Sequence, residues 1–553
     1  MKDYLTHLVC VLILTLISVT YFYPVLSNKS IQQSDISQFS GMSKQIVDHR
    51  ENFNEEPYWL DNAFLGMPSY QVSAKYPFDL LYYIDQAVRF LPRPADYLFL
   101  YLLSFYFLII SLNINYRYAL FGAIAFGFST YLIIILGVGH NTKALALGYL
   151  PFVVAGFLMI LRGNYLKGFL ISSLFLGLQV HANHYQMTYY TLIMLLVLVL
   201  VHYYDFLKSK ELKKIYKSFF VFISVGLLAL LMNSPSLLAT KEYSEFSTRS
   251  KSDITINADG SAKESLSGLD KEYITEYSYG VLESLNLIFP RFMGGGSSER
   301  IREDSKLMNF IRSLDANQAQ QVYQYSKVYW GNQPIVAAPA YIGISLFFIF
   351  LLSILLVNDL NRKWILIAIS ISLFLSWGKN FSFLTDLMID YFPLYDKFRA
   401  VSSIQIIIEF CIPLFAVMGL SKFFSNNTKE IQKLNSLKYA SVFLVSLILV
   451  FYFFGTSILD FKSDFEIFSQ YPEILNLLIE ERQYVFKSDV LRSLIIVVCC
   501  SITFYLFVKK IIKKDLTFLI ITLIVIFDLW IVDKNYVNSD QFVKKSLVEI
   551  PFQ

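Results

Sequence analysis

Apolar residues occur along this chain in long runs that short polar and charged stretches separate. Runs such as 98–112 and 192–201 contain no charged residue. A charged side chain at the centre of a membrane helix costs about 2.5–3.5 kcal/mol, so runs of this kind must span a membrane or be buried. With about 20 residues per span, we count about thirteen apolar segments, which begin near residues 6, 96, 118, 144, 168, 187, 217, 339, 364, 401, 438, 490 and 516. The pattern predicts an all-α, polytopic integral membrane protein.

The turns between these segments indicate one orientation. If the N-terminus is cytoplasmic, basic residues fall in every inward turn, at 117, 162–167, 208–217, 362–363, 422–438 and 509–514. The outward segments then carry most of the Asp and Glu residues, and they are 28–95, 137–143, 181–186, 233–338, 378–400, 457–489 and the tail from 534. We therefore expect the functional groups to lie on the outer face.

Composition agrees with a membrane protein. The 553 residues are 55% hydrophobic and 17% aromatic but only 16% charged, far from the averages of soluble domains. The formal net charge of +4 gives no support to nucleic-acid binding, because membrane proteins distribute their lysines by topology. All four cysteines lie within apolar runs, so the outward loops contain no pair that could form a disulfide.

The segments indicate a single multi-span membrane domain, 1–533, with outward insertions at 28–95 and 233–338. The first apolar run, 6–27, is too long for a signal-peptide core and lacks a cleavage pattern, so we interpret it as a retained anchor. The tail, 534–553, forms no recognisable unit, which leaves open that the natural chain continues further.

Asp35 follows the first apolar run by about eight residues, at the head of a long polar loop. A carboxylate held near lipid is costly unless it is solvated or functional. The alternative is an ordinary solvated loop residue. Several other acids of the same loop compete for a functional role, and they are Asp48, Glu51, Glu55, Glu56 and Asp61.

Two further places could hold a phosphate. The turn Gly139-His140-Asn141-Thr142-Lys143 is dense in hydrogen-bond donors, which suit a phosphate, although a capped helix start explains the same residues equally well. Arg399, at the mouth of a later span, could pair bidentately with a phosphate or carboxylate. Its alternative is an interfacial anchor that sets helix depth.

His181 and His184 stand three residues apart at the turn between the fifth and sixth segments, and Gln186 follows. The two histidines would share a helix face, but catalytic zinc usually needs three protein ligands, and spacing assigns no third. Polar packing or sugar binding is favoured over zinc. Glu409 is an expected intramembrane acid, which needs a partner unless its role is structural.

Trp330 and Asn332 belong to the string Trp330-Gly331-Asn332-Gln333-Pro334, which combines an aromatic platform with amide donors. This composition suits contacts to a sugar, and tight turn packing is an equally good account. The glycine run 294–296 lacks the Gly-Lys-Ser/Thr ending of a P-loop, so we expect a flexible loop there.

Seven strings, in order, carry a resemblance to a known family. They are the Asp35 loop, Trp59 with Phe64-x-Gly66-Met67-Pro68, 139–143, 183–190, Tyr277-Ser278-Tyr279-Gly280 leading to Phe289-Pro290 and the glycine run, 329–334, and 397–401. Over nearly the whole chain they resemble the YfhO-like family of bacterial membrane proteins, particularly its Bacteroidetes branch. That family looks like part of the GT-C superfamily of membrane glycosyltransferases.

The resemblance implies a catalytic acid in the first outward loop and donor sugars linked to polyprenyl phosphate. It makes Asp35 the leading candidate for a general base, a role worth about 10²–10⁴ in rate. We assign the donor phosphate to His140, Lys143 and Arg399, and sugar or acceptor contacts to Trp59, His184, Gln186, Trp330 and Asn332. Because the first loop has no Asp-Asp pair, a divalent metal has no support, and we assign no cofactor.

The prediction is therefore a GT-C-like glycosyltransferase of the bacterial inner membrane, with a cytoplasmic N-terminus. It moves a sugar from a polyprenyl-phosphate donor to an extracytoplasmic glycan or lipid acceptor. One alternative is a transporter or flippase of lipid-linked glycans, which Glu409 would also serve, although the internal repeats of many transporters are not visible. The other is a non-catalytic envelope assembly protein that binds partners through 233–338.

Overall fold

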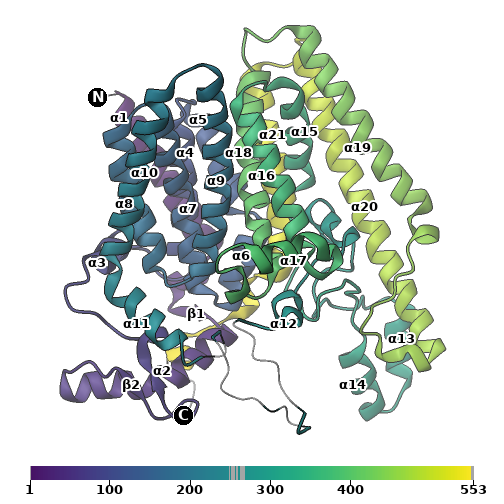
Figure 1. The fold of residues 1–553 in the computed structure, drawn as a ribbon. Helices are drawn as coiled ribbons and strands as arrows, with labels where there is room; N and C mark the ends of the chain where they lie inside the picture. Colours follow the sequence, from purple (N-terminus) through teal and green to yellow (C-terminus); the bar gives the residue numbers. More distant parts are fainter. Residues whose placement is uncertain (1, 248, 251–255, 257–258, 262–267, 550–553) are drawn as a thin grey trace.

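The structure is a computed structural model that describes residues 2–247, 249–250, 256, 259–261 and 268–549. The described part is mostly helical: long helices run side by side, and shorter elements gather at the end opposite the N-terminus (Figure 1). Eight helices of this part are long and apolar enough to cross a membrane, or up to ten if each of two bent pairs is one span. The fold thus fits a lipid bilayer, as the apolar pattern predicted.

Every apolar segment expected from the sequence falls on a helix. In the N-terminal half these are α1 (Lys2–Tyr21), α4 (Ala95–Ser111), α5 (Tyr116–Gly127) continued by α6 (Thr130–Val138), α7 (Asn141–Leu161), α8 (Tyr165–His181), α9 (Tyr185–Lys208) and α10 (Leu212–Met232). In the C-terminal half they are α15 (Ile344–Leu356), α16 (Leu360–Ser376), α18 (Ile406–Phe423), α19 (Glu430–Ile458), α20 (Pro472–Val508) and α21 (Lys514–Tyr536). Since α4 and α15 are short, the number of about thirteen spans stays a prediction.

The centre of the bundle is formed by α7 and α18. The most apolar window of α18 is entirely buried inside the protein, and that of α7 is 89% buried, whereas α10 and α19 are 17% buried over theirs. A helix that is apolar on all sides must be surrounded either by protein or by lipid. The first pair is therefore the core, and the second presents its apolar side chains to the bilayer.

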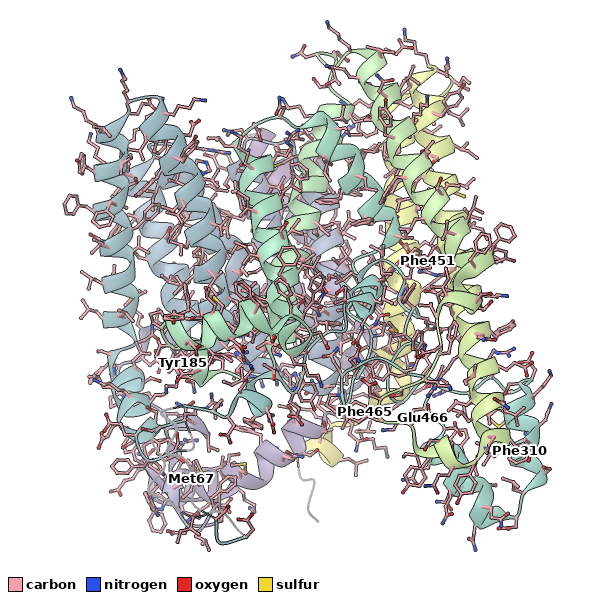
Figure 2. All side chains as sticks on the ribbon, turned by 45° about the vertical axis from the view of Figure 1, so that its right-hand side comes forward. Met67, Tyr185, Phe310, Phe451, Phe465 and Glu466 are labelled. Atoms are coloured by element: carbon pink, nitrogen blue, oxygen red, sulfur yellow. The ribbon has the colours of Figure 1, made fainter. Side chains whose placement is uncertain are left out.

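Shorter elements come mainly from the two long outward segments and from the last residues of the chain. The helices are α2 (Ser34–Phe53), α3 (Leu80–Val88), α11 (Ser234–Ser244), α12 (Lys271–Thr275), α13 (Lys306–Ser313), α14 (Ala316–Tyr325), α17 (Ser382–Tyr391) and α22 (Lys545–Glu549), and the strands are β1 (Lys29–Ile31), β2 (Trp59–Leu60), β3 (Met67–Pro68) and β4 (Phe542–Lys544). The 3-10 helices are η1 (Tyr23–Ser27), η2 (Ser69–Gln71), η3 (Leu282–Leu287), η4 (Gly378–Phe381), η5 (Tyr395–Lys397), η6 (Val401–Gln405), η7 (Ile467–Gln470) and η8 (Ser539–Gln541). Figure 2 shows two separate lobes at this end, one around Met67 and the other around Phe310.

Residues 34–53 form the helix α2, where the sequence indicated only a polar loop. Ile46 on α2 is fully buried, and it packs with Leu60, Ala63 and Met67 into a small core. Strands β2 and β3 pair antiparallel beneath it. A core of this size leaves no long apolar run in the sequence, which is why the hydrophobic pattern missed the helix.

The chain just before α2 is paired with the chain near residue 543. Strand β1 lies antiparallel to β4 with Ser30 opposite Val543. The backbone N–H of Gln32 donates to the carbonyl of Gln541 over 2.8 Å. This two-stranded sheet therefore fixes the point at which α2 begins.

Candidate active site

A cavity of about 1330 Å³ lies where the first outward segment meets the ends of the long helices. Its wall is built by the start of α2, by α3, by the α6–α7 and α8–α9 turns, and by segments 333–340 and 399–405. Six of the residues to which the sequence analysis assigned a role line it, and they are Asp35, His140, Lys143, His184, Gln186 and Arg399. The structure thus brings together residues from four distant parts of the chain.

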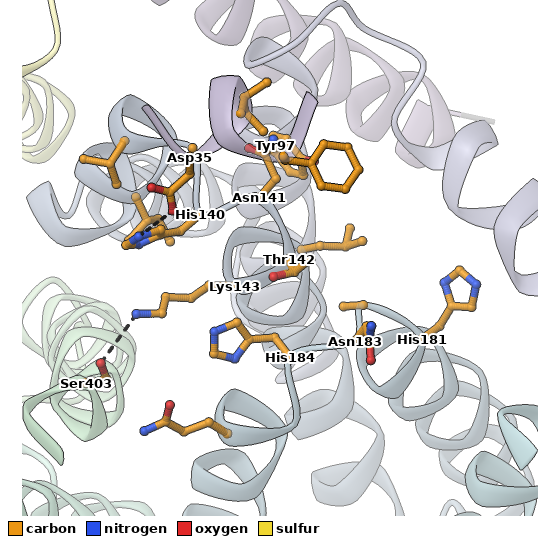
Figure 3. A pocket seen from close by; sticks show the side chains of 18 of the residues that line it. Asp35, Tyr97, His140, Asn141, Thr142, Lys143, His181, Asn183, His184 and Ser403 are labelled. Carbon is orange, nitrogen blue, oxygen red and sulfur yellow. Dashed lines mark hydrogen bonds and ion pairs between the residues drawn. The ribbon is translucent and has the colours of Figure 1, made fainter. Parts of the chain in front are cut away.

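Asp35 lies in the first turn of α2 and faces His140, the residue just before α7 (Figure 3). The carboxylate oxygen Oδ2 is 3.0 Å from Nε2 of His140, and both side chains are about half exposed to the cavity. Burial and then the charge of Lys143 lower the pKa of His140, and the opposing effect of Asp35 is smaller. The ring is therefore neutral near pH 7, which leaves the Asp35 carboxylate with a neutral neighbour.

The approach of α2 to the α6–α7 turn depends on Gly139. This residue has φ of +96°, and a Cβ atom added to it would lie 2.9 Å from Cβ of Gln33. The side chain of Gln33, in turn, donates to the carbonyl of Leu136 at the end of α6. Glycine is the residue that permits both this backbone conformation and this contact.

Lys143 reaches the cavity from the first turn of α7. Its Nζ lies 3.3 Å from the hydroxyl of Tyr131 and 3.5 Å from that of Ser403. Arg399 approaches from the segment before η6, where its guanidinium donates to the hydroxyl of Tyr273 over 2.6 Å. The backbone carbonyl of Arg399 accepts from the Gln186 side chain over 2.6 Å, which ties this segment to α9.

The α8–α9 turn presents polar side chains to the same cavity. Nε2 of His181 is hydrogen-bonded to Oδ2 of Asp79 over 2.7 Å. Burial, followed by the positive charge of Lys143, lowers the pKa of His184 to about 3. Within the described part of the chain, Nδ1 of both histidines and Oδ1 of Asn183 are buried without a hydrogen-bond partner. A buried polar atom without a partner costs about 1–3 kcal/mol, so this turn is less satisfied in its hydrogen bonds than an ordinary buried turn.

A network of buried ion pairs and hydrogen bonds around Arg89 was not predicted from the sequence. Arg89, just after α3, is buried and donates to Asp85 over 3.0 Å and to Asp96 over 2.6 Å, and Asp85 also accepts from the hydroxyl of Tyr149. Although burial acts to lower it, the pKa of Arg89 is raised, because the hydrogen bond to Asp85 and the surrounding negative charges outweigh burial. The members come from three helices and share no local sequence signal.

The charges that line the cavity are unequal. Five basic residues contribute, Lys75, Arg89, Arg93, Lys143 and Arg399, against three acidic ones, Asp35, Asp79 and Asp85. Each acid is paired, with His140, His181 and Arg89 respectively. Among the described residues, no carboxylate lies within 4.0 Å of the charged groups of the other four cations. The cavity is therefore suited to an anion.

Trp59, Trp330 and Asn332 lie outside the described lining of this cavity. Trp59 is 54% exposed and its ring packs against Gly66. The ring of Trp330 is 4.9 Å from that of Phe461, and Asn332 donates to Asp464 over 2.7 Å. These contacts are internal packing, and a role of the three residues in sugar binding stays a prediction.

Glu409 lies in α18, fully buried. In the described part of the chain neither of its carboxylate oxygens has a hydrogen-bond partner, so the expected partner is not found. Gln405, one turn earlier, lines the cavity. Across the described residues, no group of three or more His, Cys, Asp or Glu side chains is arranged to hold a metal ion.

Comparison with family models, with curated proteins and with solved structures gave no match. The resemblance to YfhO-like proteins and to the GT-C superfamily therefore stays a prediction, and the cavity is the structural basis for a function.

Proposed function

We propose that this chain is a GT-C-like glycosyltransferase of the bacterial inner membrane, related to the YfhO-like family, with about thirteen spans and a cytoplasmic N-terminus. The cavity then faces the extracytoplasmic side. A sugar passes from a polyprenyl-phosphate donor to a glycan or lipid acceptor, and Asp35 is the general base.

One observation carries the proposal: an accessible carboxylate and cations without ion pairs share a single cavity. Asp35 contacts a neutral His140 over 3.0 Å, while the charged ends of Lys143 and Arg399 contact tyrosine and serine side chains and, among the described residues, no carboxylate. Glycosyl transfer from a lipid phosphate needs this combination, a base for the acceptor and positive charge for the departing phosphate.

The reaction follows from these positions. Asp35 takes the proton of an acceptor hydroxyl while the acceptor oxygen bonds to the anomeric carbon. The bond from that carbon to the phosphate oxygen breaks, and the phosphate leaves with the electron pair. Lys143 and Arg399 stabilise the added charge. A single direct attack inverts the configuration at the anomeric carbon. In this proposal His184 and Gln186, which line the cavity, contact the sugar or the acceptor.

The test is Asp35→Asn, which keeps the side chain's size but removes the base. In cells that lack the native chain, we expect this variant to lower transfer to envelope glycan by about 10²-fold or more, measured by mass spectrometry of the envelope fraction. Asp48→Asn is the matched control, because Asp48 lies on the same helix and pairs with Lys44 outside the cavity. Membrane level and thermal stability are measured for both. Full transfer by Asp35→Asn contradicts the proposal.

Glu409 favours a second candidate, a flippase of lipid-linked glycans. A fully buried acid without a partner is costly inside a membrane and is typical of proton-coupled transport. In that case Glu409→Gln abolishes the movement of lipid-linked glycan across the membrane, and Asp35→Asn has little effect. The two variants together separate the two functions.

A further inference from the structure

Helix α3 forms one wall of the cavity. Tyr82, Asp85, Gln86 and Arg89 all line it, and their spacing places them on one face of a helix. Arg93, which follows about one turn later, lines the cavity as well. The wall therefore runs from an aromatic residue at the start of α3 to basic residues at its end.

The basic end of this wall holds two cations, Arg89 with ion pairs and Arg93 with none among the described residues, although Asp96 also attracts Arg93 at longer range. Arg89 is surrounded by Asp85 and Asp96. Arg93 is exposed, and its guanidinium lies 5.8 Å from the centre of the Tyr97 ring, on which Arg89 also lies at 4.9 Å. In the preceding loop Lys75 is likewise exposed at the cavity. Neither Arg93 nor Lys75 has a carboxylate within 4.0 Å among the described residues.

The same segment also carries exposed apolar residues, some of them at the cavity. Relative exposure is 102% for Phe78, 69% for Leu80, 68% for Tyr83 and 62% for Phe90. Phe78 and Tyr83 also line the cavity. Tyrosine is one of the residues enriched at the boundary between lipid and water, and Phe78, Leu80 and Phe90 add exposed apolar surface beside Tyr83. The α3 wall thus places positive charge that is not in a close ion pair among the described residues beside a surface suited to a hydrocarbon chain.

We propose that the α3 wall binds a phosphorylated lipid, with the phosphate at Arg93, added positive charge from Lys75 on the same cavity, and the chain along Phe78 and Tyr83. This site is separate from Lys143 and Arg399, which come from α7 and from the segment before η6. The assignment of this lipid as the acceptor rests on the proposed transferase function. If that function holds, the α3 wall receives the acceptor, and the acceptor is an anionic lipid. Two anions can share the cavity because each meets its own cations.

The chemistry of the ligand follows from the charges. A neutral glycan gains nothing from Arg93 and Lys75, whereas a phosphate gains charge-assisted hydrogen bonds from a guanidinium. A free phosphate ion would use the cations but not the exposed aromatic residues. Lipid phosphate uses both, which is why we assign that class.

The experiment measures binding of dodecyl phosphate to the purified full chain in an uncharged detergent, by native mass spectrometry and calorimetry. We expect two bound molecules. In the double variant Arg93→Gln/Lys75→Gln, the molecule at the α3 wall should bind at least tenfold more weakly. The double variant Lys143→Gln/Arg399→Gln should retain the molecule at the α3 wall. Lys44→Gln is the control, since Lys44 is 66% exposed and paired with Asp48 outside the cavity. Because Arg93 and Lys75 are exposed, thermal stability should not change.

The source of the phosphate is separated by a second arm with inorganic phosphate. Binding of inorganic phosphate as tight as that of dodecyl phosphate, and equally lost in the double variant, overturns the lipid assignment. Unchanged dodecyl phosphate binding in the double variant overturns the site. Should transfer prove independent of Asp35 while this binding still depends on Arg93, the proposed function fails and the site stands.

Discussion

At the scale of single residues, His184 lies where a charged imidazole is unfavourable. Burial and the charge of Lys143 lower its pKa to about 3, whereas an ordinary histidine has a pKa of 6.5. Between these values the unfolded chain holds a proton on this ring that the folded chain does not. The contribution of His184 to stability is therefore complete above about pH 6.5 and falls as the pH drops towards 3.

We predict that His184→Gln reduces this acid sensitivity. Glutamine keeps a polar side chain but does not titrate, so between about pH 7.5 and about pH 5 the melting temperature of the variant should fall by a few degrees less than that of the wild type. The measurement is thermal unfolding of the purified chain in detergent. His49→Gln, on α2 outside the cavity, controls for loss of an imidazole. Equal acid sensitivity of His184→Gln and wild type would contradict the prediction.

Some residues of the site could be predicted because they differ from their surroundings in the sequence. Asp35, His140 and Lys143 are polar groups next to apolar runs, and they do line the cavity. Arg93 and Asp79 look like ordinary charged residues of an outward loop. They matter only because folding brings their loop against α7 and the α8–α9 turn, and no local pattern carries that information.

At the scale of elements, the sheet of β1 and β4 determines where α2 begins and hence where Asp35 lies. Val543→Pro places a residue without an N–H group opposite Ser30 in this ladder. We predict that activity falls about tenfold or more, because small displacements of a catalytic group are costly. The melting temperature should be affected less than activity, because the sheet contributes only Ile31 and Phe542 to the main core, most of which lies in the spans. Transfer activity and thermal unfolding are measured together.

Val543→Ala is the matched control, because alanine trims the side chain but keeps the backbone donor. Its activity should remain close to that of the wild type. If alanine and proline lower activity equally, the side chain of Val543 matters and the ladder does not. If neither does, the sheet does not position Asp35.

The elements divide in a similar way between those that the sequence predicts and those that it does not. A span such as α18 needs a long apolar run, and its position follows from that run alone. Helix α2 buries Ile46 in a small core that includes Met67, and strands β1 and β4 have three residues each. Their stability comes from partners distant in the sequence, so hydrophobic periodicity gives no signal for them.

At the scale of the whole molecule, the distribution of charge gives the chain two distinct ends. The turn between α18 and α19 carries basic residues and lies at one end of the molecule. The lobe of α2 with β2 and β3 lies at the opposite end, where the cavity is (Figure 1). Lysine and arginine favour the cytoplasmic side. We therefore predict that the cavity opens to the outside, the side on which the proposed acceptor would lie.

Cysteine labelling tests this orientation. With Cys499 replaced by alanine, because it is the exposed cysteine of the four, Asn62→Cys or Asn426→Cys provides one new accessible thiol. Both positions are exposed, Asn62 at the cavity end and Asn426 between α18 and α19. We predict that a membrane-impermeant maleimide labels Asn62→Cys in cells whose outer membrane alone has been opened, and labels Asn426→Cys only after the inner membrane is opened as well. The reverse pattern would place the cavity in the cytoplasm, where neither an extracytoplasmic acceptor nor the assigned role of Asp35 could apply.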